Sequence, residues 1–223
     1  MLNDAYKGMR AQGRAIYDSF YCRPFSDKET LGTVNQWTIR TSGLSDSSVV
    51  YSGGVGADIS FELDLVKRFG CHVFLFDPSP VGVATIESLS GNPYMEKIHF
   101  FPVALADSSE GVSIEVGGIH DGQAWIKTGS GDQMRSTSIG DFMRSQGHTR
   151  IDLFKIDIEG FEYGVIENCL EEGLEIRQIC LEFHHFYPDI PEKKTQTAIR
   201  HLKYAGYSLI HKHMYEFTFQ LSS

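Results

Sequence analysis

From about residue 48, short apolar and β-branched runs alternate along the chain with longer stretches of helical periodicity. The apolar runs predict strands at residues 48–52, 72–76, 98–104, 153–157 and 178–183. The stretches between them predict helices at residues 59–69, 81–89, 138–146, 163–171 and 194–204. Strands that alternate with helices are typical of parallel βαβ units, so this pattern predicts an open α/β sheet.

Three segments depart from this alternation. Residues 207–211 and 215–221 alternate like two antiparallel strands, which predicts a C-terminal hairpin at the edge of the sheet. Residues 1–47 predict an amphipathic helix and then a polar loop around Trp37, a cap over the main domain of residues 48–223. Residues 107–137 are rich in glycine and serine, which predicts an inserted hairpin.

Composition narrows the class of protein. A chain of 223 residues, 41% hydrophobic and 22% charged, suits one globular domain with an extension. The net charge is -9 and acidic residues are spread along the sequence, so nothing indicates a basic surface for a phosphate backbone, and we expect a small-molecule substrate and no nucleic acid. The four cysteines form no Cys-x-x-Cys pair, and no apolar run reaches membrane-spanning length. We therefore expect reduced thiols and a cytoplasmic protein away from membranes; the oligomeric state stays open.

Glycines follow the first predicted strand of the main domain. Residues 49–58 lead from an apolar run through Ser52, Gly53, Gly54 and Gly56 into a predicted helix. Glycines let the backbone turn tightly and let a ligand approach closely, and the start of a helix favours negative charge. A cofactor turn and an ordinary strand-to-helix turn are both compatible with this cluster.

The second predicted strand ends in Asp77 and Pro78, about 20 residues beyond the glycines. An acid at that distance is typical of a residue that binds ribose hydroxyls. The alternative is a turn aspartate that caps a helix. At the end of the third strand, Ala104 and Leu105 are candidates to pack on an adenine ring and Asp107 to accept from its amino group, unless Asp107 is a turn residue.

Charged residues gather where the fourth strand ends, in the segment of residues 152–163. Alternation places Lys155 and Asp157 on one side, and Glu159 and Glu162 follow in the next turn. Buried charges need partners, so such a group at a strand end indicates a site. A helix-capping arrangement with a Lys155 salt bridge is the alternative.

The segment from Lys155 to Glu162 (Lys-Ile-Asp-Ile-Glu-Gly-Phe-Glu) resembles the hallmark of the FkbM-type methyltransferases, and the resemblance covers about residues 48–185. It implies a Rossmann-like class I methyltransferase sheet, mostly parallel with an antiparallel C-terminal hairpin, and methyl transfer from S-adenosyl-L-methionine, commonly to an oxygen of a sugar or natural product. It further implies that Gly54, Gly56, Asp77 and residues 104–107 contact the cofactor, whose methionine carboxylate would lie at residues 52–56. Asp157 and Glu159 would lie beside the methyl group or hold the acceptor.

One position departs from the family pattern. The first strand of the family usually ends in an acidic residue, whereas this chain has Val50 and Ser52 there. The nearest carboxylate downstream is Asp58. This departure bears on activity more than on fold.

The fifth strand ends in Glu182 and His184, which alternation places on one face. A histidine of near-neutral pKa is a candidate general base for a hydroxyl acceptor. Asp157, Glu182 and His184 are also candidate ligands for a divalent cation, magnesium or manganese. A purely structural histidine is the alternative.

These features favour a methyltransferase in which holding the acceptor and the methyl group together supplies most of the catalysis. Two other functions remain open. A nicotinamide-dependent oxidoreductase shares the glycine turn and the second-strand acid, although the Gly-x-Gly-x-x-Gly spacing is absent. A non-catalytic cofactor-binding or scaffold protein would explain the altered first strand.

Overall fold

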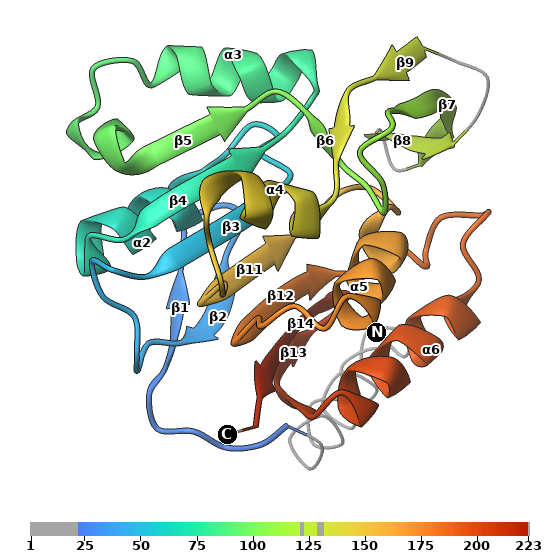
Figure 1. Ribbon diagram of the computed structural model, residues 1–223. Helices are drawn as coiled ribbons and strands as arrows, with labels where there is room; N and C mark the ends of the chain where they lie inside the picture. The colour runs from blue at the N-terminus through green and yellow to red at the C-terminus, as the bar shows by residue number, and fades with distance from the viewer. Residues whose placement is uncertain (1–21, 121–122, 129–131, 223) are drawn as a thin grey trace, which may run out of the picture.

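The computed structural model describes residues 22–120, 123–128 and 132–222 (Figure 1). Most of the helix expected in the N-terminal segment therefore lies outside the described residues. Within the described part of the chain, no helix is long and apolar enough to cross a membrane.

A seven-stranded sheet in the order β13-β14-β12-β11-β3-β4-β5 forms the centre of the fold. The parallel strands are β3 (Val49–Gly53), β4 (His72–Phe76), β5 (Ile98–Phe101), β11 (Leu153–Ile156) and β12 (Gln178–Glu182). The antiparallel pair β13 (Tyr207–His213) and β14 (Glu216–Leu221) joins the edge of β12. The expected α/β fold, with its class I methyltransferase sheet and antiparallel C-terminal hairpin, is confirmed.

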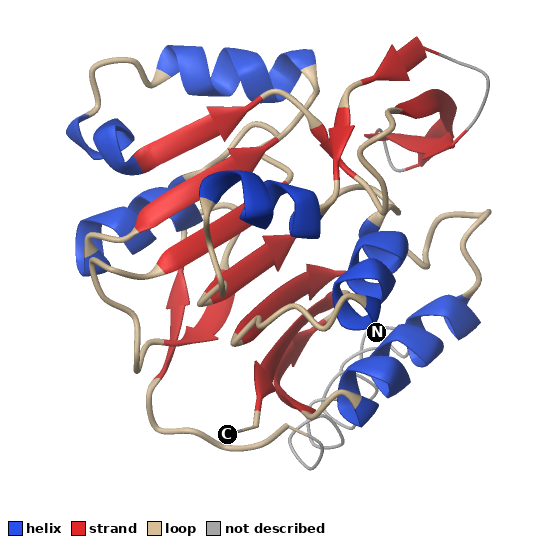
Figure 2. Cartoon of the chain, in the orientation of Figure 1, coloured by secondary structure: helices blue, strands red, loops and turns tan. Residues whose placement is uncertain are grey.

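Helices cover both faces of this sheet (Figure 2). One face packs against α4 (Ile139–Gln146), α5 (Glu162–Glu171) and α6 (Glu192–Tyr204). The other packs against α2 (Ser60–Phe69), the C-terminal part of α3 (Pro80–Ser88) and the short 3-10 helix η1 (Pro93–Lys97).

Strand β3 shows how alternation divides the two cores. Tyr51 belongs to the core beneath α4, α5 and α6, whereas Val50 belongs to the core beneath α2. Ser52 is also fully buried, on the Val50 side. Because β11 alternates in the same way, Phe154 faces α4 and α5 while Lys155 shares the α2 side with Ser52.

The N-terminal segment holds a hairpin where a polar loop was expected. Strands β1 (Lys28–Leu31) and β2 (Trp37–Arg40) pair antiparallel, and Trp37 is 3% exposed. Trp37 and Ile39 alternate with the half-buried Thr38 and Arg40 and pack on the α2 side of the sheet. The expectation of a polar loop was wrong because an alternation over four residues is too short to stand out among the polar residues around it.

Two further segments differ in detail from the expected elements. The strand expected over residues 98–104 ends at Phe101, since Pro102 lacks the N–H that a sheet needs. The chain resumes as β6 (Ala104–Leu105), which pairs with β10 (Ser136–Thr137). The inserted segment forms three strands rather than two, β7 (Val112–His120), β8 (Gln123–Thr128) and β9 (Asp132–Met134).

Candidate functional site

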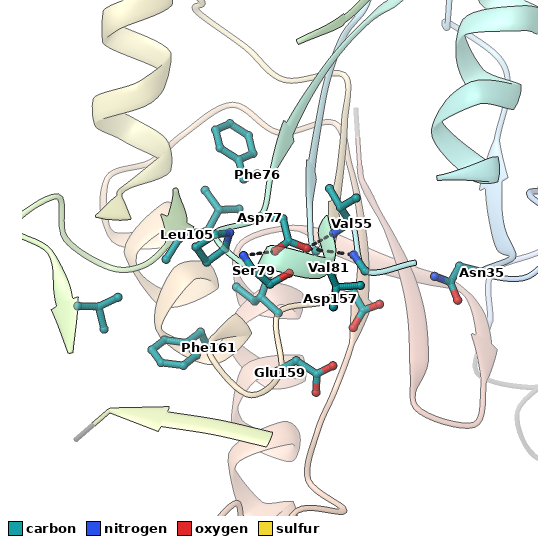
Figure 3. A pocket seen from close by; sticks show the side chains of 16 residues that line it. Asn35, Val55, Phe76, Asp77, Ser79, Val81, Leu105, Asp157, Glu159 and Phe161 are labelled. Carbon is teal, nitrogen blue, oxygen red and sulfur yellow. Dashed lines mark hydrogen bonds between the residues drawn. The ribbon is translucent and has the colours of Figure 1, made fainter. Parts of the chain in front are cut away.

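A cavity of about 440 Å³ opens beside the carboxyl ends of β3, β4 and β11 (Figure 3). The order of the chain reverses across β3, since β4 follows on one side and β11 on the other, and ligands of open α/β sheets bind at such switch points. Its volume lies in the range of small-molecule sites. Most of the lining residues come from the glycine turn, the end of β4, β6 and the turn after β11.

The glycine turn passes against the backbone of β11. Gly54 has a φ of 84°, and a Cβ at this position would lie 1.8 Å from the carbonyl oxygen of Asp157. Only glycine allows both this conformation and this approach. Gly54 N donates to the carbonyl of Phe76 at 2.9 Å, so the turn is also hydrogen-bonded to β4 on its other side.

Asp77 holds this turn from β4. One carboxylate oxygen, Oδ2, accepts from the N–H groups of Val55 at 2.8 Å and Gly56 at 3.0 Å, and Oδ1 accepts from Ser79 N at 2.7 Å (Figure 3). Asp77 is 6% exposed yet lines the cavity. Asp77 can therefore be both a turn aspartate and an acid at the cofactor site, the two roles considered for it from the sequence.

The other predicted cofactor residues divide into two groups. Gly54, Gly56, Pro78, Ala104 and Leu105 line the cavity together with Asp77. Ser52, Gly53 and Asp107 are not among the lining residues. Ser52 is buried below the turn, and Asp107 is exposed beside Gly164 of α5.

One side of the cavity is apolar and the other is charged. Leu105 and Phe161 lie on the apolar side, and Figure 3 shows them well separated from Asn35 and Asp157. Such a division suits a ligand with a flat ring at one end and polar groups at the other.

Three carboxylates surround His184 at the charged side. Its Nε2 lies 3.7 Å from Asp157 and 3.5 Å from Glu159, and its Nδ1 lies 3.2 Å from Glu162. Burial alone would lower the pKa of His184, but the Glu162 hydrogen bond and the nearby negative charges raise it to about 9. The imidazole is therefore protonated near neutral pH, whereas the sequence suggested a neutral base.

The turn that carries these carboxylates has an unusual backbone. Glu159 adopts a φ of 56°, and its carboxylate accepts a hydrogen bond from the Tyr187 hydroxyl. Burial, the largest effect, raises the pKa of Glu159. Positive φ in a residue other than glycine is uncommon and concentrates at functional sites.

Glu182 completes the cluster at the end of β12. Burial and the neighbouring Asp157 raise the pKa of Glu182 to about 8. One ligand atom each from Asp157, Glu182 and His184 lies within 4.8 Å of the others, so the three residues expected to bind a cation are brought together. A divalent cation would have to displace the proton of His184, because only the neutral imidazole is a ligand.

A buried polar group lies below the glycine turn, and the sequence pointed to Lys155 in it but not to Glu62. The Lys155 ammonium donates to the carbonyl oxygens of Gly54 at 2.6 Å and Gly53 at 3.3 Å, and it lies 3.7 Å from Asp157. Glu62 of α2 accepts from the Ser52 hydroxyl at 2.6 Å and is 3% exposed. Burial raises the pKa of Glu62, and the positive charge of Lys155 opposes that rise.

The family's first strand usually ends in an acidic residue, which this chain lacks. Glu62 of α2 places a carboxylate beside Ser52 near the end of β3 instead. Asp58, the carboxylate noted from the sequence, is used elsewhere, because it accepts from Asn35 N and from Ser60. The sequence did not single out Glu62, since Asp64 of the same helix is also acidic.

Comparison with known proteins gives consistent results. The model of the methyltransferase FkbM domain matches residues 54–209. Probable methyltransferase-like protein 24 of Homo sapiens is 29% identical over 153 residues, which are 67% of this chain and 36% of that protein. The Rattus norvegicus protein of the same name is 27% identical over 155 residues with the same coverage, so the chain spans about a third of the length of these relatives.

Among solved structures, the METTL16 MTase domain superposes with a TM-score of 0.49 and 11% identity, covering 82% of this chain and 61% of that one. A fibrillarin pre-rRNA processing protein of Methanococcus jannaschii gives a TM-score of 0.47 and 9% identity, covering 89% and 84% of the two chains. The family model bears out the resemblance found in the segment from Lys155 to Glu162, and it covers most of the cavity-lining residues. The chain belongs to the methyltransferase FkbM domain family.

Proposed function

We propose that this domain binds S-adenosyl-L-methionine in the 440 Å³ cavity and transfers its methyl group to a hydroxyl of a small molecule such as a sugar or natural product. The observation that carries this proposal is one continuous cavity lined by the glycine turn, Asp77, Leu105 and Asp157. The adenine ring would lie toward Leu105 and Phe161, and the ribose near Asp77. The cofactor supplies an activated methyl group on a sulfonium centre.

The residues of the chain would then act on the acceptor. Asp157 and Glu159 line the cavity and can hold an acceptor hydroxyl by accepting its hydrogen bond. Burial raises the pKa of Glu159, which makes this carboxylate a better base than an exposed glutamate. His184 is charged near neutral pH and lies within 3.7 Å of both groups, so its role is to orient them and offset their charge.

The net charge of -9 supports an acceptor other than nucleic acid, because no excess of positive charge is available to neutralise phosphates. Membership of the methyltransferase family, together with the Asp157 cluster, argues against the nicotinamide oxidoreductase. A non-catalytic cofactor-binding protein remains the alternative that the experiment must separate.

The experiment has two stages. Calorimetry should show that S-adenosylhomocysteine binds and that NAD does not; absence of S-adenosylhomocysteine binding would refute the proposal. A screen of hydroxylated sugars and small metabolites with methyl-labelled cofactor should then find an acceptor. Asp157→Asn and Glu159→Gln should lower methyl transfer by about 10²-fold or more with cofactor affinity retained. Binding without transfer to any acceptor would favour the non-catalytic alternative.

A divalent cation is a second candidate component, because Asp157, Glu182 and His184 meet at one point. It would acidify the acceptor hydroxyl. Loss of transfer with a chelator and recovery with magnesium or manganese would support this role, and full activity in excess chelator would exclude it.

A further inference from the structure

The β1–β2 loop contributes a residue to the cavity from outside the segment that matches the family model. Asn35 lines the cavity, although the matched segment begins at residue 54. It is exposed at the end of the cavity away from Leu105 and Phe161 (Figure 3).

Three hydrogen bonds fix this loop on the start of α2. Gly32 N donates to Asp64 at 3.0 Å, Thr33 N to the Ser60 hydroxyl at 2.8 Å, and Asn35 N to Asp58 at 3.1 Å. All three use the backbone of the loop, so the side chain of Asn35 plays no part in them. The Asn35 amide is therefore held at the cavity by contacts that do not consume it.

The donors of the glycine turn are already engaged within the protein. Gly54 N donates to Phe76, and the N–H groups of Val55 and Gly56 donate to Asp77. An anionic group at this end of a ligand would have to displace Asp77 or find another donor. Binding an unpaired carboxylate in such a site is costly.

Among the described side chains that line the cavity, two carry a hydrogen-bond donor when the carboxylates are ionised, Asn35 and Ser79. The Ser79 hydroxyl accepts from Gly82 N at the start of α3, beside Asp77. Asn35 lies on the Asp157 side, which is the polar end of the cavity (Figure 3).

We propose that the Asn35 side-chain amide donates a hydrogen bond to the α-carboxylate of the bound cofactor, so that the β1–β2 hairpin is part of the cofactor site. This inference rests on the proposed function. The sequence led us to expect the α-carboxylate of the cofactor at the glycine turn. The N–H groups of that turn are bonded to Asp77 and Phe76, so Asn35 is proposed as the donor instead.

The test compares two ligands that differ in the amino-acid part. S-Adenosylhomocysteine carries the carboxylate, and 5′-methylthioadenosine has the same nucleoside and thioether without it. Asn35→Ala should weaken S-adenosylhomocysteine binding by about tenfold or more, as expected for a lost hydrogen bond to a charged group. It should change the affinity for 5′-methylthioadenosine by less than about twofold. Asn35→Asp should weaken S-adenosylhomocysteine binding further, because two carboxylates would then face each other.

Thr33→Ala is the matched control, since Thr33 is exposed in the same loop and its hydrogen bond to Ser60 comes from the backbone. It should bind both ligands as the wild type does. Equal losses for both ligands in Asn35→Ala, an unchanged affinity for both, or tighter binding in Asn35→Asp than in Asn35→Ala would overturn the inference. A wild-type protein that fails to bind S-adenosylhomocysteine would instead refute the proposed function.

Discussion

Lys155 offers a direct test of the buried polar group below the glycine turn. The side chain is 3% exposed and donates to the carbonyls of Gly53 and Gly54. Lys155→Met keeps a chain of similar length and removes the charge. Gly53 O would retain the hydrogen bond from Asp157 N at 3.1 Å, whereas Gly54 O would lose its 2.6 Å contact with the ammonium.

The magnitude follows from the groups left behind. A buried carbonyl that loses its partner costs about 1–3 kcal/mol. Removing one partner of a buried charged group costs about 3–5 kcal/mol. Glu62 can relieve part of that cost by taking up a proton, because burial already raises its pKa. We therefore expect Lys155→Met to lower the free energy of unfolding by about 3–4 kcal/mol at pH 7.

Urea unfolding followed by circular dichroism measures this change. Lys203→Met removes an exposed lysine of α6 and should stay within about 0.5 kcal/mol of the wild type. Glu62→Gln in the Lys155→Met background should cost less than the same substitution in the wild type, with a coupling of about 1–2 kcal/mol. A loss below about 1 kcal/mol for Lys155→Met, or additive effects in the double variant, would show that these groups do not depend on one another.

Two further predictions concern the stability of the glycine turn and of the charged cluster. Gly54→Ala should destabilise the protein far more than Gly43→Ala. Both glycines have positive φ, but a Cβ at Gly54 would lie 1.8 Å from the carbonyl oxygen of Asp157, whereas a Cβ at Gly43 would meet nothing within 4 Å. Equal unfolding midpoints for the two variants would contradict this. The pKa of His184 is raised from 6.5 to about 9, so the protonated imidazole contributes about 3 kcal/mol of stability. This contribution is complete below pH 6.5 and is lost as the pH rises to 9. The wild-type melting temperature should therefore fall over this range and that of His184→Gln should fall less, and parallel curves for the two proteins would refute the assignment.

The main elements could be predicted from the sequence because each forms either a compact apolar run or a stretch of helical periodicity. The expected boundaries of β4 agree with the structure at both ends, and those of β12 differ by one residue. Such strands are buried on both faces and bounded by polar turns, which leaves little ambiguity in their limits. The β1–β2 hairpin was missed because four-residue strands give too short an alternation to stand out among polar neighbours.

The candidate site was predicted where its residues follow directly from the ends of neighbouring parallel strands. Asp157 and Glu159 follow β11 directly, and the sheet places them at the cavity without help from distant segments. The charge of His184 depends on Glu162, which lies 22 residues away and is buried beneath it. Neither that pairing nor the approach of Asn35 to the cavity is encoded in local spacing, so both emerge only in three dimensions.

The positions of Lys155 and Asn35 imply different consequences for stability and binding. Lys155 is buried, and the same ammonium holds the glycine turn and lies 3.7 Å from Asp157, so its loss disturbs the folded chain and the site together. Asn35 is exposed, and the backbone hydrogen bonds of its loop survive removal of the side chain. Stability and ligand affinity should therefore fall together in Lys155 variants, whereas Asn35 variants should change affinity at unchanged stability. This difference follows from burial, because a group already in water leaves no unpaired partner in the protein when it is removed.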